Sequence, residues 1–270
     1  MYQTQPQILT NDVIRAIAPS VFATEPWHAM SDRYAFIPTI NVVDTMRDNG
    51  FQPFSVQQAR TRIEGKGEFT KHLIRFRDMR SGNTPQLVKH GGLFPEVILT
   101  NAHDGGSAYK LNAGIFRCVC INGLVAGDSY SQLSVRHSGN VDGVMNATFE
   151  LVNEFPKLMG QVEEFGQLQL SAPAATAFAE AALSLRYDED SPAPVQPSQV
   201  LRPRRSDDRA SDLFTTFNVV QEHLTQGGAR GYNPRTRPRV KVRAVTGIGE
   251  NTRLNKALWT LTERMAQLVS

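Results

Sequence analysis

Residues 54–77 read FSVQQARTRIEGKGEFTKHLIRFR, and this stretch decides the fold of the first half of the chain. Apolar and polar side chains alternate over Phe54–Ile63 and again over Phe69–Arg77, which is typical of strands with one buried face. The link Glu64-Gly65-Lys66-Gly67 has the glycines of a hairpin connection. The stretch therefore predicts a β-hairpin.

The segments around this hairpin extend it into a larger sheet. Short apolar runs predict further strands at 96–100, 109–111, 115–125 and 132–137, with Asn112-Ala113-Gly114 separating the second from the third. Before the hairpin, Thr10 is expected to cap a helix over Asn11–Ala18, and Thr39 one over Ile40–Asp48. We expect an α+β fold, with packed helices on an antiparallel or mixed sheet over about residues 50–137.

The second half of the chain has helical periodicity. Helices are expected over 141–162, divided by Pro156, and over 172–185, 212–225 (capped by Ser211) and 251–269. Prolines concentrate in 188–199, which is typical of a linker or exposed loop. The predicted organisation is an α+β core domain over 1–187, a linker over 188–199, and a helical C-terminal part over 200–270 with a basic loop at 230–243.

Composition argues against several classes of protein. The chain has 270 residues, 40% hydrophobic and 20% charged, which is ordinary globular usage. It has no secretory signal pattern and no run of roughly 18–20 apolar residues. Cys118 and Cys120 lie too close together for an unstrained disulfide and are too few for zinc, so we interpret them as buried strand residues, with a redox or metal pair as the alternative. We expect a cytoplasmic protein without a cofactor or membrane partner.

Charge is segregated along the chain. Residues 51–80 carry seven lysines and arginines against three acidic residues, 139–190 carry two against nine, and 200–245 carry ten against four. In the hairpin, alternation would place Arg60, Arg62, Lys71, Arg75 and Arg77 on one solvent-facing surface, where they could contact phosphates. The plainer interpretation is that such cations protect strands from edge pairing.

The basic loop at 230–243 strengthens the case for an anionic partner. Tyr232 could stack on a base. The loop carries six cations without an acidic residue among them: Arg230, Arg235, Arg237, Arg239, Lys241 and Arg243. Three alternatives stay open: a disordered loop with no partner, a loop lying against the acidic segment 139–190, and a loop docked on that segment of a neighbouring chain. The last would favour a head-to-tail homo-oligomer or ring.

An enzymatic interpretation depends on the run Asn101-Ala102-His103-Asp104-Gly105. Asn101, His103 and Asp104 after an apolar strand would suit acid–base chemistry. The spacing matches no metal or nucleophile signature, and Asp-Gly-Gly is also ordinary turn chemistry. The sequence therefore favours a non-enzymatic role, with no catalytic or metal residue assigned.

Several motifs resemble a known family. They are Arg33-Tyr34-Ala35-Phe36-Ile37-Pro38-Thr39, Gly50-Phe51-Gln52-Pro53-Phe54, Asn101-Ala102-His103-Asp104-Gly105, Phe116-Arg117-Cys118-Val119-Cys120-Ile121-Asn122-Gly123 and Leu254-Asn255-Lys256-Ala257-Leu258-Trp259. With them the chain resembles the uncharacterised YfjQ/YafZ/YubP family, part of a larger group catalogued as domain of unknown function 932. Ala102 stands where family members tend to have serine. The resemblance implies a gene of prophages and conjugative plasmids, but no activity.

Mobile elements pass through single-stranded DNA, and the helix-then-meander order is similar in architecture to single-strand annealing recombinases, whose motifs are absent. Our hypothesis is a sequence-tolerant nucleic-acid protein that binds or anneals single-stranded DNA. The alternatives are an interaction protein that inhibits a host defence or replication protein through 139–190, and an enzyme using His103 and Asp104.

Overall fold

A computed structural model describes residues 7–30, 34, 36–80, 82, 84–118, 122–125, 133–135, 141–233, 235 and 238–270. The chain divides into two compact units. The first comprises Met1–Gln86, Gly92–Leu124 and Tyr130–Pro156, and the second comprises Leu87–Gly91, Val125–Ser129 and Lys157–Ser270.

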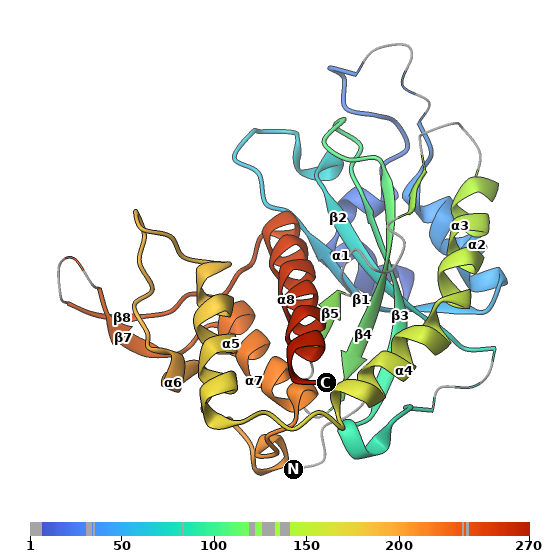
Figure 1. The fold of residues 1–270 in the computed structure, drawn as a ribbon. Coiled ribbons are helices and arrows are strands. Elements are labelled where there is room, and N and C mark those ends of the chain that lie inside the picture. Colours follow the sequence, from blue (N-terminus) through green and yellow to red (C-terminus); the bar gives the residue numbers. More distant parts are fainter. Residues whose placement is uncertain are drawn as a thin grey trace. The chain divides into compact units, whose positions relative to one another are not determined.

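The first unit is built on a β-sheet (Figure 1). Its strands are β1 (Phe51–Gln58), β2 (His72–Asp78), β3 (Leu93–Asn101), β4 (Tyr109–Arg117), β5 (Asn122–Val125) and β6 (Leu133–Val135). The order is β1-β2-β3-β4-β5, and β6 also pairs with β4. The pairs β1–β2, β2–β3, β3–β4 and β4–β6 are antiparallel. The α+β class with an antiparallel sheet is confirmed.

Helices α1 (Asn11–Ile17), α2 (Thr39–Asp48) and α3 (Asp142–Asn153) complete this unit, and α4 (Phe155–Phe165) begins at its end. Thr10 caps α1 as expected, since its Oγ1 accepts a hydrogen bond from Val13 N. The expected cap by Thr39 is wrong, because the helix starts one residue earlier and Pro38 occupies the N-cap position. The side chain of Thr39 is fully buried instead.

Strand β4 runs through the expected break at Asn112-Ala113-Gly114. The neighbouring β3 explains this, since Ile98 pairs with Asn112 and Glu96 with Gly114 in an unbroken register. The neighbouring strand supplies hydrogen-bond partners for the backbone N–H and C=O groups of this segment, and a turn there would lose those partners. Tertiary pairing thus overrides the local turn signal.

The second unit is mainly helical. It contains α5 (Ala172–Ser184), α6 (Pro197–Val200), α7 (Leu213–Gln226), α8 (Ile248–Val269) and a two-stranded ribbon of β7 (Arg230–Tyr232) and β8 (Arg239–Lys241). Helix α7 is buried over its whole length from Leu213 to Thr225. Its cap is Asp212, whose Oδ1 accepts from Thr215 N at 2.8 Å, and not Ser211.

The division between the units falls at Pro156 and Lys157, before the proline-rich segment 188–199. Helix α5 packs on α7 and α8, which places it with the C-terminal helices. The proline-rich segment lies inside the second unit, where Val195 is buried and the Pro194 carbonyl accepts a hydrogen bond from Tyr232 N at 3.0 Å. This segment is therefore packed within the second unit.

Among the described helices, none combines the length and the apolar character that crossing a bilayer requires.

Candidate nucleic-acid interface

The basic loop of the second unit is partly an ordered ribbon. Strands β7 and β8 pair antiparallel, with Arg230 opposite Lys241, Gly231 opposite Val240 and Tyr232 opposite Arg239. Directly paired residues share a face of a ribbon, and the next pair along lies on the other face. Arg230, Lys241, Tyr232 and Arg239 therefore share one face, which we call the cationic face.

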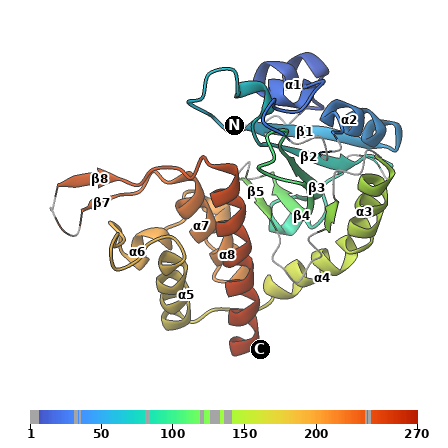
Figure 2. The same ribbon diagram turned by 90° about the horizontal axis from the view of Figure 1, so that it is seen from above.

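Gly231 allows the ribbon face opposite the cationic face to pack closely against the rest of the second unit. A Cβ on Gly231 would lie 1.7 Å from the Pro194 carbonyl oxygen, so no other residue fits there without moving the ribbon. The Gln199 side chain donates to the Arg230 carbonyl at 2.8 Å, on the same strand. At the base of the ribbon, Gly228 N donates to the Val242 carbonyl at 2.8 Å, and Val242 is buried. The ribbon follows the end of α7 (Figure 2).

The cationic face is exposed and lacks acidic partners. Arg230, Tyr232, Arg239 and Lys241 are all exposed. Within the described part of the chain, no carboxylate forms an ion pair with Arg230, Arg239 or Lys241. Exposed cations without counter-charges attract polyanions over about a Debye length, roughly 8–10 Å at moderate salt.

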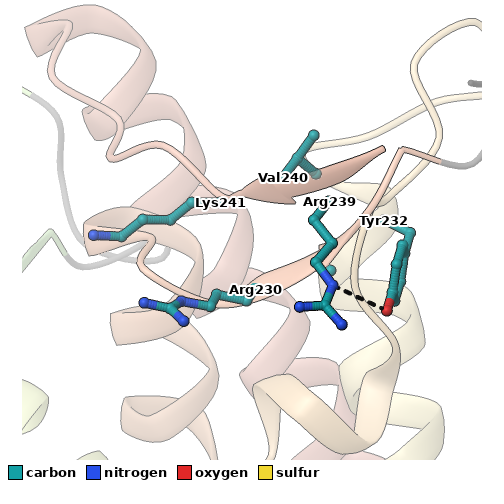
Figure 3. A pocket seen from close by; sticks show the side chains of 6 residues that line it. Arg230, Tyr232, Arg239, Val240 and Lys241 are labelled. Atoms are coloured by element: carbon teal, nitrogen blue, oxygen red, sulfur yellow. Dashed lines mark hydrogen bonds between the residues drawn. The ribbon is translucent and has the colours of Figure 1, made fainter. Parts of the chain in front are cut away.

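The residues of the ribbon also line a pocket. A hollow of about 450 Å³ is lined by Arg230, Gly231, Tyr232, Arg239, Val240 and Lys241. Figure 3 shows Arg239 beside the ring of Tyr232, Arg230 beside Lys241, and Val240 pointing away from them. Arg239 Nε donates to the Tyr232 hydroxyl at 3.4 Å, and its guanidinium lies 6.0 Å from the ring centroid. An aromatic ring and three cations thus surround one concave surface.

The other loop cations have separate surroundings. Arg235 donates to the Glu189 carbonyl at 3.0 Å and lies 3.9 Å from the Asp190 carboxylate. This is an intramolecular contact with the acidic segment, made at the tip of the ribbon. Arg243 is exposed beyond β8, whereas Arg237 lies outside the described residues.

The cationic strip expected on the first hairpin is wrong for two of its members. Arg75 and Arg77 are 6% and 2% exposed, and both bind the buried Glu96 carboxylate of β3, at 3.1 and 2.9 Å. The Arg77 guanidinium also lies 3.9–4.7 Å from the ring centroids of three phenylalanines: Phe54, Phe94 and Phe116. Burial and this neutralisation remove both arginines from any solvent-facing surface.

Arg60, Arg62 and Lys71 lie beyond the paired strands. The expected tight link is instead a connection from Ala59 to Lys71, closed where Ala59 N donates to the Lys71 carbonyl at 2.7 Å. Arg60 and Arg62 are exposed on this connection, and Lys71 is half-buried. These three belong to the first unit and the ribbon to the second, so the two expected groups of cations are parts of different units.

His103 lies in a buried polar cluster of the first unit. Its Nε2 is 3.0 Å from Thr39 Oγ1, which is also 2.9 Å from His72 Nε2 and accepts from Asn101 Nδ2 at 3.0 Å. The exposed fraction of all four side chains is zero. A substrate outside the protein cannot touch His103 in this arrangement.

The hydrogen bonds of the cluster assign its protons. Ser20 Oγ donates to Gln58 Oε1, so it accepts from His72 Nδ1 at 2.8 Å. His72 Nε2 then takes the single Thr39 hydroxyl proton, and His103 donates through its Nε2. Burial lowers the pKa of His72 to about 3, with the neighbouring His103 as a smaller cause, so the His72 ring is neutral.

Asp104 has the structural role that its turn motif allows. Its Oδ1 accepts from Gly106 N at 2.9 Å, and Gly105 has a φ of 76°, which favours glycine. Its other oxygen lies 3.0 Å from Lys66 Nζ. Nothing in this geometry assigns Asn101, His103 or Asp104 to catalysis. Across the described residues, no group of three or more His, Cys, Asp or Glu side chains could hold a metal ion.

Of the two cysteines, Cys118 follows β4 and is half-buried, and burial raises the pKa of its thiol. A raised pKa makes a thiol less reactive. Cys120 lies outside the described residues, so the alternative of a redox or metal pair stays a prediction.

Comparison with known proteins places the chain in a family. Residues 26–259 match the family described as "Domain of unknown function (DUF932)", and the chain belongs to it. It is 41% identical to the UPF0380 protein YafZ of Escherichia coli K12 and 40% identical to the UPF0380 protein YfjQ of the same strain. Each match covers 95% of this chain and 91% of the relative. No solved structure matches the chain.

Sequence reasoning missed two kinds of residue. Arg230 belonged to the expected basic loop, but its pairing with Lys241 and the close packing of Gly231 were not expected; the Arg-Gly-Tyr alternation opposite Arg-Val-Lys was a usable strand signal. Thr39, His72 and Ser20 form the buried cluster, for which the sequence contains no local signal, since these residues are 19 and 33 positions apart.

Proposed function

We propose that this protein is a sequence-tolerant nucleic-acid-binding protein, with single-stranded DNA as its expected ligand. The observation that supports this most is the alignment of Arg230, Arg239 and Lys241 on one exposed ribbon face, without carboxylate partners among the described residues. Phosphates that meet these cations release condensed counterions, which drives binding of any sequence.

The family resemblance extends this proposal to the biology of the protein. It would act in the cytoplasm, on DNA of a prophage or plasmid, where single strands arise during transfer and replication. An oligomer or ring would multiply the ribbon contacts along one strand. Comparing the molecular mass in solution with and without an oligonucleotide tests that part.

Fluorescence anisotropy of a labelled single-stranded oligonucleotide, at several salt concentrations, tests binding. The key variant is Lys241→Glu, which places a carboxylate opposite Arg230 and removes the charge of that pair. We expect weaker binding, and a slope of log affinity against log salt that is smaller by about 1.4, since each of two lost phosphate contacts contributes about 0.7 on a single strand.

Arg264→Glu is the matched control, because it makes the same change in charge at an exposed position of α8. Arg264 donates to Gln267 on its own helix at 3.0 Å and lies away from the ribbon in sequence. We expect this variant to keep the salt slope of the unchanged protein. Absence of binding by the unchanged protein at micromolar concentration and low salt would refute the proposal, and so would equal effects of the two variants.

A further inference from the structure

The two ends of the cationic face differ in chemistry. Arg230 and Lys241 form a purely cationic pair, whereas Tyr232 and Arg239 form an aromatic and cationic pair. These pairs lie two residues apart along the strands, which is about 7 Å. That spacing is comparable with the length of one extended nucleotide, so a phosphate at one pair would place its base near the other.

Tyr232 is unusual among the aromatic residues. The residue is 56% exposed, and no other described phenylalanine, tyrosine or tryptophan is exposed. Exposing the apolar surface of a ring to water is unfavourable, because apolar surface is stabilised by burial. The backbone of Tyr232 is nevertheless fixed, since its N donates to the Pro194 carbonyl at 3.0 Å. The ring is thus exposed on an anchored strand.

The hollow beside this ring has a suitable size. Its volume of about 450 Å³ lies within the range of small-ligand sites, roughly 300–1,000 Å³. Arg239 lies on the same surface and adds a planar guanidinium, which can itself stack or bind phosphate. A planar base therefore finds an exposed ring, an adjacent guanidinium and cations one nucleotide away.

Resting on the nucleic-acid binding proposed above, we infer that the ribbon binds an unstacked base on the ring of Tyr232, with the adjoining phosphates on Arg230 and Lys241. A duplex keeps its bases stacked and paired, and extracting one costs a few kcal/mol. The ribbon therefore distinguishes single strands from duplexes and from bare phosphate chains. Stacking uses the face that every base has, so this selectivity is independent of sequence.

The test measures the binding of Tyr232→Ala and Tyr232→Phe to three probes of equal length: a single-stranded oligonucleotide, its duplex, and a strand whose sugars lack bases. We expect Tyr232→Ala to weaken binding of the base-bearing single strand by about tenfold or more, and to leave the strand without bases unchanged. Tyr232→Phe keeps the ring and loses only a long, exposed hydrogen bond, so we expect its affinities to stay within about twofold of the unchanged protein.

Tyr232 is exposed, so both variants are expected to keep the melting temperature of the unchanged protein. Equal affinity of the unchanged protein for all three probes would overturn the stacking inference, as would an equal loss on all three in Tyr232→Ala. In either case the salt-dependent effect of Lys241→Glu would still support nucleic-acid binding. Failure to bind any probe would instead overturn both.

Discussion

The arginines of β2 and the cations of the β7–β8 ribbon have the same sequence pattern and opposite environments. Arg75 and Arg77 alternate with Ile74 and Phe76, just as Arg239 and Lys241 flank Val240. The first pair is buried on Glu96, whereas the second is exposed without an acidic partner among the described residues. Alternation shows which residues share a strand face, but the partner strands decide whether that face meets water.

The largest expected loss of stability follows from replacing Glu96, the buried partner of two arginines. Glu96→Gln leaves Arg75 and Arg77 buried without their counter-charge, and we expect it to lower the free energy of unfolding by about 3–5 kcal/mol. Urea unfolding followed by circular dichroism measures the change. A loss below 1 kcal/mol would contradict the burial of these arginines.

A compensated variant sharpens this experiment. Replacing all three charges together, as Arg75→Met, Arg77→Met and Glu96→Leu, removes the buried charges and keeps their volume. We expect the triple variant to be more stable than Glu96→Gln alone, because apolar residues need no ionic partner. If the triple variant proves less stable than Glu96→Gln, the charges have a further role.

The next effect concerns the buried cluster of the first unit. His103→Ala removes a bond to Thr39 and the ring packed 4.8 Å from Phe36, and we expect a loss of about 2–4 kcal/mol. Thermal unfolding measures it. An unchanged melting temperature would contradict the structural role and restore the enzymatic alternative.

Acid should destabilise the protein through His72. Its folded-state pKa is held at about 3 by burial, below the ordinary 6.5, so the unfolded chain takes up a proton first as the pH falls. This contribution is absent above pH 6.5 and grows towards pH 3, reaching about 2 kcal/mol between pH 7 and pH 5. Measuring the free energy of unfolding of the protein and of His72→Gln across this pH range isolates the contribution of His72. The assignment would be contradicted if the two free energies changed with pH in the same way.

The smallest change in the free energy of unfolding is expected for an exposed ion pair. Arg235 and Asp190 form a long, exposed pair at the tip of the ribbon, and such pairs contribute under about 1 kcal/mol. Arg235→Ala should therefore change the free energy of unfolding by less than about 0.5 kcal/mol. A loss as large as that of Glu96→Gln would mean that the acidic segment holds the ribbon in place.

Local signals predicted much of the fold. Thr10 capped α1 as expected, and the apolar spacing of α7 and α8 gave both helices to within about three residues. The errors occurred where distant residues compete with local preference. Strand β4 continues through Asn112-Ala113-Gly114 because it pairs with β3 there. Thr39 is buried against two histidines instead of capping the helix.

The candidate site was predicted in part for the same reason. Tyr232, Arg239 and Lys241 formed a visible basic run, but their shared face depends on the register of β7 with β8. Burial of Arg75 and Arg77 depends on Glu96, which is 21 and 19 positions away, respectively, and no local sequence signal indicates its role.

Photo-crosslinking tests the contrast between these two regions most directly. A single-stranded oligonucleotide carrying a photoreactive base is irradiated with the protein, and mass spectrometry of the digested complex locates the attachment. Crosslinks at Tyr232 or elsewhere within 228–243, and none at 72–78, are the result that we predict. Attachment confined to other parts of the chain, with the ribbon unmodified, would contradict the account.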